Sequence, residues 1–329
     1  MKNTYYKLIE QSFKFPQKGF KVEDNFLTFH GVSLKNLIKK YGTPFRLFYL
    51  PNIGEKINIA KKIFNQAISK YNYKGDYHYC YCTKSNHFSH VVNAALNENV
   101  HLETSSSFDI DLILNLFKEK KINNKLIVIN NGYKTTEYLK KIISLHDFGF
   151  ENVIVVLDNK SELDRLTNLL KGSHKKIKIG IRMAINEEAQ SSYYTSRMGI
   201  RHSEIIDFHN LNIKNNKSVE LKMLHFYVDS GIKDSLYFWG EFKKALKLYV
   251  DLNKQSSSLN SFNIGGGFPI RNNLGFDYDY EHIADSIIKN IKESCEANKV
   301  IDPNIFTEFG KYTVGESGAI IFKVLEQKQ

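Results

Sequence analysis

The chain has 329 residues, of which 42% are apolar and 13% aromatic, so it can bury a large core, and general disorder is excluded. This length suits one α/β barrel with an appendage better than a single small domain. Lys and Arg outnumber Asp and Glu by 46 to 35, a formal charge of +11. The lysines are scattered in pairs such as Lys39-Lys40 and Lys120-Lys121, without a basic arm. Because nucleic-acid binders concentrate charge on one element, no nucleic-acid partner is expected.

The cysteine count and the N-terminus bear on the cellular compartment. Cys80, Cys82 and Cys295 are too few for a disulfide framework, which favours the reducing cytoplasm. Residues 1–15 carry charges without an apolar segment, so they do not read as a signal peptide. No apolar stretch reaches the length of a membrane span, and no membrane partner is expected.

The first fifty residues differ in pattern from the rest. They offer a strand over Phe26–Phe29, a helix over Leu34–Lys40 stopped by Gly42, and an extended Thr43–Leu50. We interpret residues 1–50 as part of a β-rich domain and its linker.

From Asp76 onward, period-2 apolar runs alternate with amphipathic stretches, which predicts a parallel sheet. The expected strands are Tyr77–Cys82, Val100–Glu103, Lys125–Asn130, Asn152–Asp158, Ile177–Met183, Leu221–Val228, Ser261–Ile264 and Ile305–Glu308. The expected helices are Phe88–Leu96, Phe108–Phe117, Thr136–Leu145, Glu162–Leu170, Phe238–Leu252 and His282–Ile291. About eight strands is the number that closes a TIM-like (β/α)8 barrel, here assigned to residues 51–310. An open, doubly wound sheet is the alternative.

A last strand-like run covers Ala319–Leu325, with no visible pairing partner nearby in the sequence. An unpaired strand edge is unfavourable. We therefore interpret residues 311–329 as the start of a truncated C-terminal β-domain, which together with the N-terminal segment forms an incomplete β-domain.

Polar or glycine residues end nearly every predicted strand. In a barrel these ends converge on one mouth, where catalytic groups lie. The residues are Lys84, Glu103, Asn130-Asn131-Gly132, Asp158, Arg182, His225 with Tyr227 and Asp229, Gly265-Gly266-Gly267, and Glu308.

Taken singly, each candidate has a plain structural reading. Lys84 at a barrel mouth suits Schiff-base chemistry but could be a lysine that reaches solvent from a strand end. Gly265-Gly266-Gly267 could form an anion-binding nest for phosphate or only a tight turn. Glu308 could protonate a heterocycle, bind a cation or serve as a salt-bridge partner.

Metal ligands are not indicated. His87 and His90 stand three residues apart near a helix start, but no HExxH motif or cysteine partner accompanies them. We expect surface or capping histidines and no metal. Cys80 and Cys82 fall on one face of a strand and are expected in the core.

Together these motifs resemble the alanine-racemase-like (fold type III) pyridoxal phosphate (PLP) decarboxylases, which act on ornithine, diaminopimelate or arginine. The matching segments follow the family's order along nearly the whole chain. They are Tyr81–Asn86, Leu102–Ser106, Ile181–Met183, Asn263–Pro269 and Glu308–Lys311.

The resemblance implies roles for these positions. Lys84 would carry the cofactor covalently, Glu308 would keep its ring nitrogen protonated, and Tyr227 would stack on the ring. Glu103 and Arg182 would support the cofactor's polar edge. The remaining cofactor-binding positions implied are His225, Ser230, Gly265, Gly266, Gly267, Gly310 and Lys311.

Within the family, Leu102–Asp109 and Asn131–Lys134 with Glu137-Tyr138 look closest to bacterial biosynthetic arginine decarboxylases. The resemblance thus implies conversion of L-arginine to agmatine and CO2 in polyamine (spermidine) synthesis, by a homodimer or higher homo-oligomer. Diaminopimelate and ornithine are the alternative substrates.

Several positions depart from the family pattern. Tyr227 stands where a histidine is usual. Phe309 and Lys311 replace Pro and Arg, so the positive charge is kept but the two-pronged hydrogen bonding of a guanidinium is lost. The family's Cys-Asp loop and its phosphate-binding tyrosine are not found in this sequence. A non-catalytic PLP-binding relative is therefore a further alternative.

Overall fold

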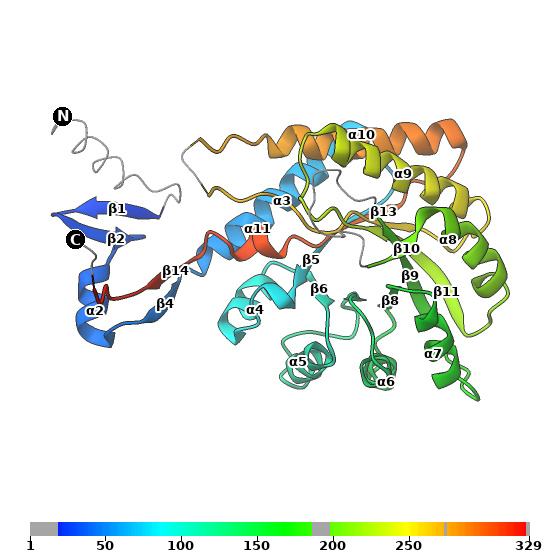
Figure 1. Cartoon of the computed structure of the whole chain (residues 1–329), viewed down its shortest axis with the longest axis horizontal. Helices are drawn as coiled ribbons and strands as arrows, with labels where there is room; N and C mark the ends of the chain where they lie inside the picture. The colour runs from blue at the N-terminus through cyan, green and yellow to red at the C-terminus, as the bar shows by residue number, and fades with distance from the viewer. Residues whose placement is uncertain (1–18, 186–197, 273–274, 327–329) are drawn as a thin grey trace.

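The computed structural model describes residues 19–185, 198–272 and 275–326. Within these ranges eight parallel strands close into a barrel, because each pairs with the next along the chain and the last pairs with the first (Figure 1). They are β5 (Tyr77–Cys82), β6 (His101–Thr104), β7 (Val128–Asn130), β8 (Val153–Leu157), β9 (Ile177–Ala184), β11 (Val219–Phe226), β12 (Ser261–Asn263) and β13 (Asn304–Thr307). The predicted TIM-like barrel is confirmed, and closure excludes the open doubly wound sheet.

A helix follows each barrel strand in the chain and packs outside it. These helices are α4 (Ser89–Leu96), α5 (Ser107–Lys118), α6 (Thr136–Ser144), α7 (Ser161–Leu169), α8 (His202–Phe208), α9 (Leu236–Asn253), α10 (Tyr280–Asn298) and α11 (Gly310–Val314). The short strand β10 (Ile200–Arg201) adds to the edge of β9. All six helices predicted from periodicity are present, whereas α8 and α11 were not predicted.

The longest helix of the described chain, α3 (Pro51–Lys70), was also not predicted. It begins at a proline, which favours the first helical turn, and buries Ile53, Ile57 and Phe64 on one face. It packs against α10 and α11 and thus covers the side of the barrel where the chain enters. The 3–4 spacing of these apolar residues is a signal that sequence reasoning could have used.

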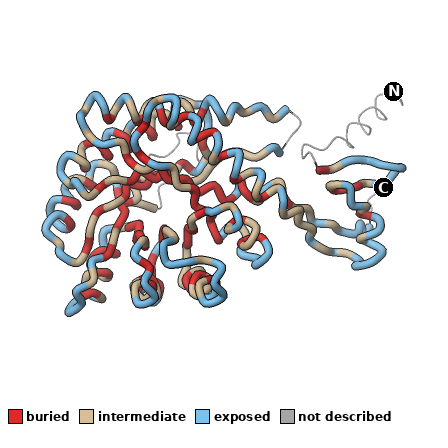
Figure 2. The backbone as a smooth tube through the Cα atoms, turned by 180° about the vertical axis from the view of Figure 1, so that it is seen from behind, coloured by how far each residue is buried: buried red, intermediate tan, exposed pale blue. Residues whose placement is uncertain are grey.

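Two apolar layers build the core. The larger layer lies between the strands and the surrounding helices and accounts for most of the buried residues in Figure 2. The smaller layer lies inside the barrel and consists of Cys80, Ile129, Ile154, Val156, Met223 and Phe306. These side chains fill the barrel interior, so the barrel has no open channel along its axis.

The N-terminal segment and the chain's last strand form small sheets beside the barrel (Figure 1). The antiparallel strands β1 (Phe20–Glu23), β2 (Phe26–Phe29) and β3 (Val32–Ser33) precede α2 (Leu34–Tyr41), and β4 (Phe45–Phe48) pairs with β14 (Gly318–Ile321). The expectation that the C-terminal strand has no partner is therefore wrong. Its partner lies about 270 residues earlier, a separation that local sequence patterns do not reveal.

Three local expectations from the sequence can be compared with the structure. No helix in the described ranges is both long and apolar enough to cross a membrane. His87 and His90 are exposed, as predicted for surface histidines. Cys80 and Cys82 are both buried, as expected for core residues.

Candidate active site

The mouth of the barrel carries polar residues because side chains alternate along each strand. Cys80, Val156 and Phe306 fill the barrel interior. The residues two positions further along, which share their face, are Cys82, Asp158 and Glu308. The same alternation brings Glu103, His225 and Asn263 to the mouth from β6, β11 and β12. The two-residue repeat of each strand thus places apolar side chains inside the barrel and polar side chains at its mouth.

Lys84 lies in the short helical turn η1 (Thr83–Ser85) directly after β5. Its Nζ is 2.9 Å from Glu103 Oε1 and 3.3 Å from Ser105 Oγ. Burial alone would lower the pKa of Lys84, but Glu103, Cys82 and Glu308 together outweigh it and raise the pKa. Burial raises the pKa of the fully buried Glu103, and Lys84 opposes that rise. The pair therefore holds a proton at the mouth, within reach of an incoming group.

Glu308 directly follows β13 and is 6% exposed. Its Oε1 accepts hydrogen bonds from Asn131 Nδ2 at 2.9 Å and Asn263 Nδ2 at 2.7 Å. Burial alone would raise its pKa, but the nearby His225, Lys84 and the Asn131 amide lower the pKa to about 2. Glu308 is thus an ionised acid in a nearly sealed position.

The three glycines after β12 make the bend that sequence reasoning singled out. Gly265 and Gly267 have positive φ angles of 68° and 115°, which side chains rarely tolerate. A Cβ on Gly266 would lie 2.7 Å from the Glu308 carbonyl oxygen, and one on Gly267 would lie 2.9 Å from Gly231 Cα. Only glycine allows this close approach of three loops.

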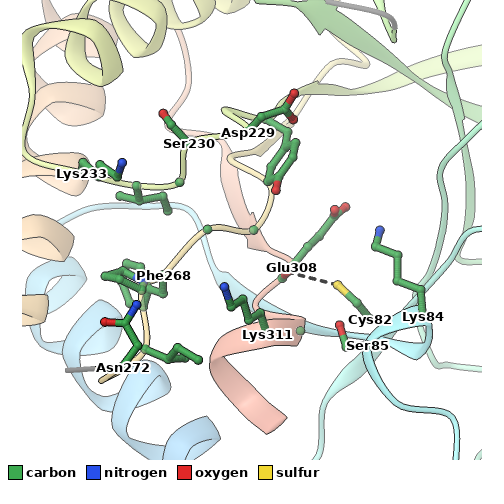
Figure 3. Close-up of a pocket in the computed structure, with 18 of the residues that line it drawn as sticks. Cys82, Lys84, Ser85, Asp229, Ser230, Lys233, Phe268, Asn272, Glu308 and Lys311 are labelled. Atoms are coloured by element: carbon green, nitrogen blue, oxygen red, sulfur yellow. Dashed lines mark hydrogen bonds between the residues drawn. The ribbon is translucent and has the colours of Figure 1, made fainter. Parts of the chain in front are cut away.

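One cavity of about 570 Å³ collects most of these groups (Figure 3). Among the predicted site residues, its lining includes Lys84, Tyr227, Ser230, Gly266, Gly267, Glu308, Gly310 and Lys311. Four predicted site residues do not line the cavity themselves but contact a residue that does. They are Glu103, Arg182, His225 and Gly265. Lys84, the glycine bend and Glu308 therefore lie at the same end of the barrel.

Arg182 projects from β9 beside the cavity. Its Nη1 lies 3.8 Å from Asp158 Oδ1, and its guanidinium carbon lies 5.8 Å from the centre of the Tyr227 ring. A guanidinium at this distance from an aromatic face is attracted to it. Arg182 therefore orients Tyr227, the aromatic residue in the register of the family's usual histidine.

The site also contains residues to which no catalytic or cofactor-binding role was assigned from the sequence, although Asn131 and Asp229 were expected at the mouth. Asn131 and Asn263 bind Glu308, and Asp229 and Lys233 line the cavity beside Ser230. Asn131 and Asn263 were visible as polar residues at strand ends, but nothing local showed that both meet the same acid. Lys233 lies in a loop, where no periodic signal marks it.

Three potential metal ligands meet at the mouth. The ligand atoms of Cys82, Glu103 and Glu308 lie within 4.8 Å of one another. The ammonium of Lys84 donates a hydrogen bond to the Glu103 carboxylate. The Cys82 thiol donates to the backbone carbonyl oxygen of Glu308 at 3.1 Å. The arrangement is that of a hydrogen-bonded cluster, and the expectation of no metal stays a prediction.

Comparison with protein-family models identifies one match across most of the chain. The pyridoxal binding domain of pyridoxal-dependent decarboxylases matches residues 56–315. A biosynthetic arginine decarboxylase of Prochlorococcus marinus (strain MIT 9515) is 26% identical over 307 residues, covering 87% of this chain and 46% of the relative.

Solved structures show the same fold. The biosynthetic arginine decarboxylase of Campylobacter jejuni superposes with a TM-score of 0.75 at 23% identity, covering 92% of this chain and 52% of that one. Diaminopimelate decarboxylase of M. jannaschii gives a TM-score of 0.78 at 18% identity, covering 93% and 69%. The chain spans about half the length of the curated relatives it matches.

Proposed function

Because this chain belongs to the family of pyridoxal-dependent decarboxylases, we propose that its protein decarboxylates a basic amino acid, with L-arginine as substrate and agmatine and CO2 as products. The observation that carries the proposal is that Lys84, Gly266-Gly267 and Glu308 line one cavity. The relatives named biosynthetic arginine decarboxylase, at about a quarter identity, support arginine over other substrates.

The side chains at the mouth fit PLP, the cofactor of the matched domain. At one end of the cavity, Lys84 offers an amine, and Glu308 offers an ionised carboxylate that accepts a hydrogen-bond donor. At the other end of the cavity lie the glycine bend and Lys311, which offer backbone N–H groups and a positive charge. A ligand with donor groups at one end and a phosphate at the other satisfies both ends.

Each residue then has a distinct task. Lys84 would hold the cofactor through its amine, and Glu308 would hold a proton on the ring nitrogen. PLP, when bound, supplies a conjugated ring that takes up the electron pair released from a broken bond. The phosphate would rest on the residues at the far end of the cavity, which are Ser230, Gly265, Gly266, Gly267, Gly310 and Lys311.

The rest of the rim would orient the cofactor. Tyr227 would stack on the ring, with Arg182 behind it. His225 Nε2 lies 3.6 Å from Glu308 Oε2; burial lowers the pKa of His225, and the nearby Glu308 carboxylate opposes that shift. Glu103 would orient the amine of Lys84.

The wider assignments are part of the same proposal. Residues 1–50 and 311–329 would contribute to a β-domain, and residues 51–310 would form the PLP-binding barrel. The protein would act in the cytoplasm, in polyamine (spermidine) synthesis, as a homodimer or higher homo-oligomer. A decarboxylase for ornithine or diaminopimelate is the nearest alternative.

A second candidate function, a non-catalytic PLP-binding protein, is favoured by one local feature. Tyr227 and Asp229 replace the usual histidine and a small residue in the segment that faces ring and phosphate. An exposed carboxylate beside the phosphate end is unfavourable for anion binding. The cofactor would then stay attached through Lys84 but lose the orientation that turnover needs.

Cofactor attachment is tested by visible absorbance. The purified protein is mixed with PLP, dialysed and reduced with borohydride, and the modified lysine is identified by peptide mass. We expect absorbance near that of a protonated imine and labelling of Lys84, both lost in Lys84→Ala. Labelling at another lysine would overturn the assignment.

Substrate choice is tested by release of labelled CO2 from arginine, ornithine, lysine and diaminopimelate, using the natural full-length protein. We expect arginine to be consumed at least tenfold faster than the others. Release from none of the four, by protein that retains PLP, would support the non-catalytic alternative instead.

A further inference from the structure

Two asparagines from distant strands meet on one oxygen of Glu308. Asn263 ends β12, next to β13, and Asn131 follows β7 across the barrel. Their Nδ2 atoms lie 2.7 and 2.9 Å from Glu308 Oε1. Both asparagines are buried, with 0% and 4% exposure. Oε2 is the oxygen on the His225 side.

Each asparagine has a second attachment that links Glu308 to another part of the site. Asn263 Oδ1 accepts the backbone N–H of Gly265 at 2.8 Å, where the glycine bend begins. Asn131 Nδ2 also donates to Glu103 Oε1 at 3.0 Å, and Glu103 binds Lys84. A continuous hydrogen-bond chain therefore crosses the mouth from the glycine bend to the lysine amine.

Amides suit these two positions for a chemical reason. The neutral NH2 group donates two hydrogen bonds without adding charge, and Asn131 uses its group for both carboxylates. Bonds to the charged form of an acid favour that form. An aspartate at either position would instead place a third carboxylate in a buried cluster, and like charges at such distances disfavour ionisation.

A buried ion pair fixes the loop that carries Asn131. Lys134 and Glu162 are both 0% exposed, and their charged atoms lie 3.1 Å apart. Lys134 Nζ also donates to the Gly132 carbonyl at 2.7 Å, and Glu162 accepts the backbone N–H groups of Lys134 and Asp158 at 2.8 and 2.9 Å. These bonds leave the loop little freedom to move Asn131 away from the acids.

We propose that Asn131 and Asn263 are positioning residues that hold Glu308 through Oε1, so that Oε2 is the oxygen presented to the ring nitrogen of the ligand. This inference deepens the proposed function and rests on it for the identity of the ligand. Neither asparagine reacts; both act through Glu308. The bond from Asn263 to Gly265 fixes the position of Glu308 relative to the glycine bend. The bond from Asn131 to Glu103 fixes it relative to Lys84.

The first test follows the proton of Glu308 without cofactor. Glutamate carrying 13C at the side-chain carboxyl is incorporated, the Glu308 signal is assigned by its loss in Glu308→Gln, and its shift is followed from pH 7 to pH 4. We expect no titration in the wild type. Asn131→Asp and Asn263→Asp should each raise the midpoint by more than two pH units, bringing it into this range.

Asn130→Asp is the matched control. Asn130, the last residue of β7 and directly before Asn131, is also buried, but it bonds Thr104 Oγ1 and the Ile154 carbonyl and not Glu308. Its variant should leave the Glu308 signal unchanged. Equal shifts in the control, or none in the two test variants, would overturn the proposal. If an aspartate variant does not fold, Asn131→Ala and Asn263→Ala, which remove the donors without adding charge, take its place.

The second test uses the protein loaded with PLP. We expect the test variants to retain PLP at least tenfold less tightly and to show a shifted pH dependence of the cofactor's absorbance, with Lys84 still labelled. Retention and absorbance within twofold of wild type would overturn the proposal. A wild type that binds no PLP would count against the proposed function alone, because the carboxyl titration is made without cofactor.

Discussion

Lys84 and Lys134 show how burial decides the task of a single residue. The Lys84 side chain is 54% exposed and faces the cavity, so its amine can meet a ligand. The Lys134 side chain is sealed against Glu162, and burial lowers its pKa against the opposing pull of that carboxylate. Both lie near strand ends and look alike in the sequence. Only the first can react, because the second is already enclosed on all sides by protein.

A histidine pair at the opposite end of the barrel makes stability depend on pH. His78 Nδ1 lies 3.2 Å from His101 Nε2, and His101 Nδ1 accepts the Ile127 N–H, so both rings are bound in neutral form. Burial, followed by the positive charges of His78 and Lys61, lowers the pKa of His101 to about 4. The unfolded chain therefore takes up a proton near pH 6.5 and the folded chain does so only near pH 4.

We accordingly expect the free energy of unfolding to fall as the pH drops through the window from about 6.5 to about 4, by an amount on the order of 2 kcal/mol from His101. Urea unfolding at a series of pH values measures the slope in wild type and in His101→Gln. The variant should lose part of the slope. An identical slope in both proteins would exclude His101 as its source.

At the scale of elements, contacts between loops determine the shape of the barrel mouth. The β12 bend brings Gly266 against the end of β13 and Gly267 against the loop after β11, so three connections meet without side chains between them. The ion pair of Lys134 and Glu162 ties the loop after β7 to the end of β8 in the same manner. Strands set the radius of the site, and these contacts set its shape.

Gly267→Ala should open the bend. Its positive φ and the 2.9 Å approach of Gly231 Cα leave no room for a methyl group. We expect PLP to bind at least tenfold more weakly, with a smaller loss for pyridoxal, which lacks the phosphate. Equilibrium dialysis measures both. Gly240→Ala in α9, where nothing lies within 4 Å, is the control and should bind as wild type does.

Lys134→Met should destabilise the fold by about 3 to 5 kcal/mol, because it leaves Glu162 as a buried, unpaired charge. Adding Glu162→Gln should restore part of the loss, since the amide oxygen still accepts a backbone N–H. Denaturant unfolding measures both variants. Lys171→Met, at an exposed position after α7, should be nearly neutral, and a similar loss there would point to a cause other than the ion pair.

At the scale of the whole molecule, burial is uneven. The barrel and its helices hold nearly all of the buried residues, whereas β1 to β4 and β14 beside it are largely exposed or half-buried (Figure 2). Exposed large apolar side chains gather there, including Phe26, Ile38, Ile320 and Phe322. Few buried contacts mean a low free energy of local opening.

Hydrogen exchange read by mass spectrometry should therefore separate the two parts. We expect peptides covering 20–48 and 318–322 to exchange well before those covering β5, β8 and β9, under conditions where the barrel stays folded. Simultaneous exchange of both parts would show that the small sheets open only with the whole barrel.

The sequence by itself determined the repeating strand–helix order, a strand number that suits a barrel, and the residues at the strand ends. These follow from local periods, 2 for strands and 3.6 for helices, and from the rule that parallel strands end on one side. Lys84, the glycine bend and Glu308 were identified in this way. The helix α3 was missed although its apolar spacing was readable.

The tertiary structure alone decided which groups meet. The pairing of β4 with β14 and the convergence of Asn131 and Asn263 on Glu308 join residues that are 45 to 270 or more positions apart. No local preference encodes such contacts, because they depend on the closure of the barrel and on how its loops pack. Closure of the barrel buries Lys134 and leaves Lys84 exposed to the cavity. Because of this difference in burial, Lys84 is a candidate for chemistry, whereas Lys134 has a structural role.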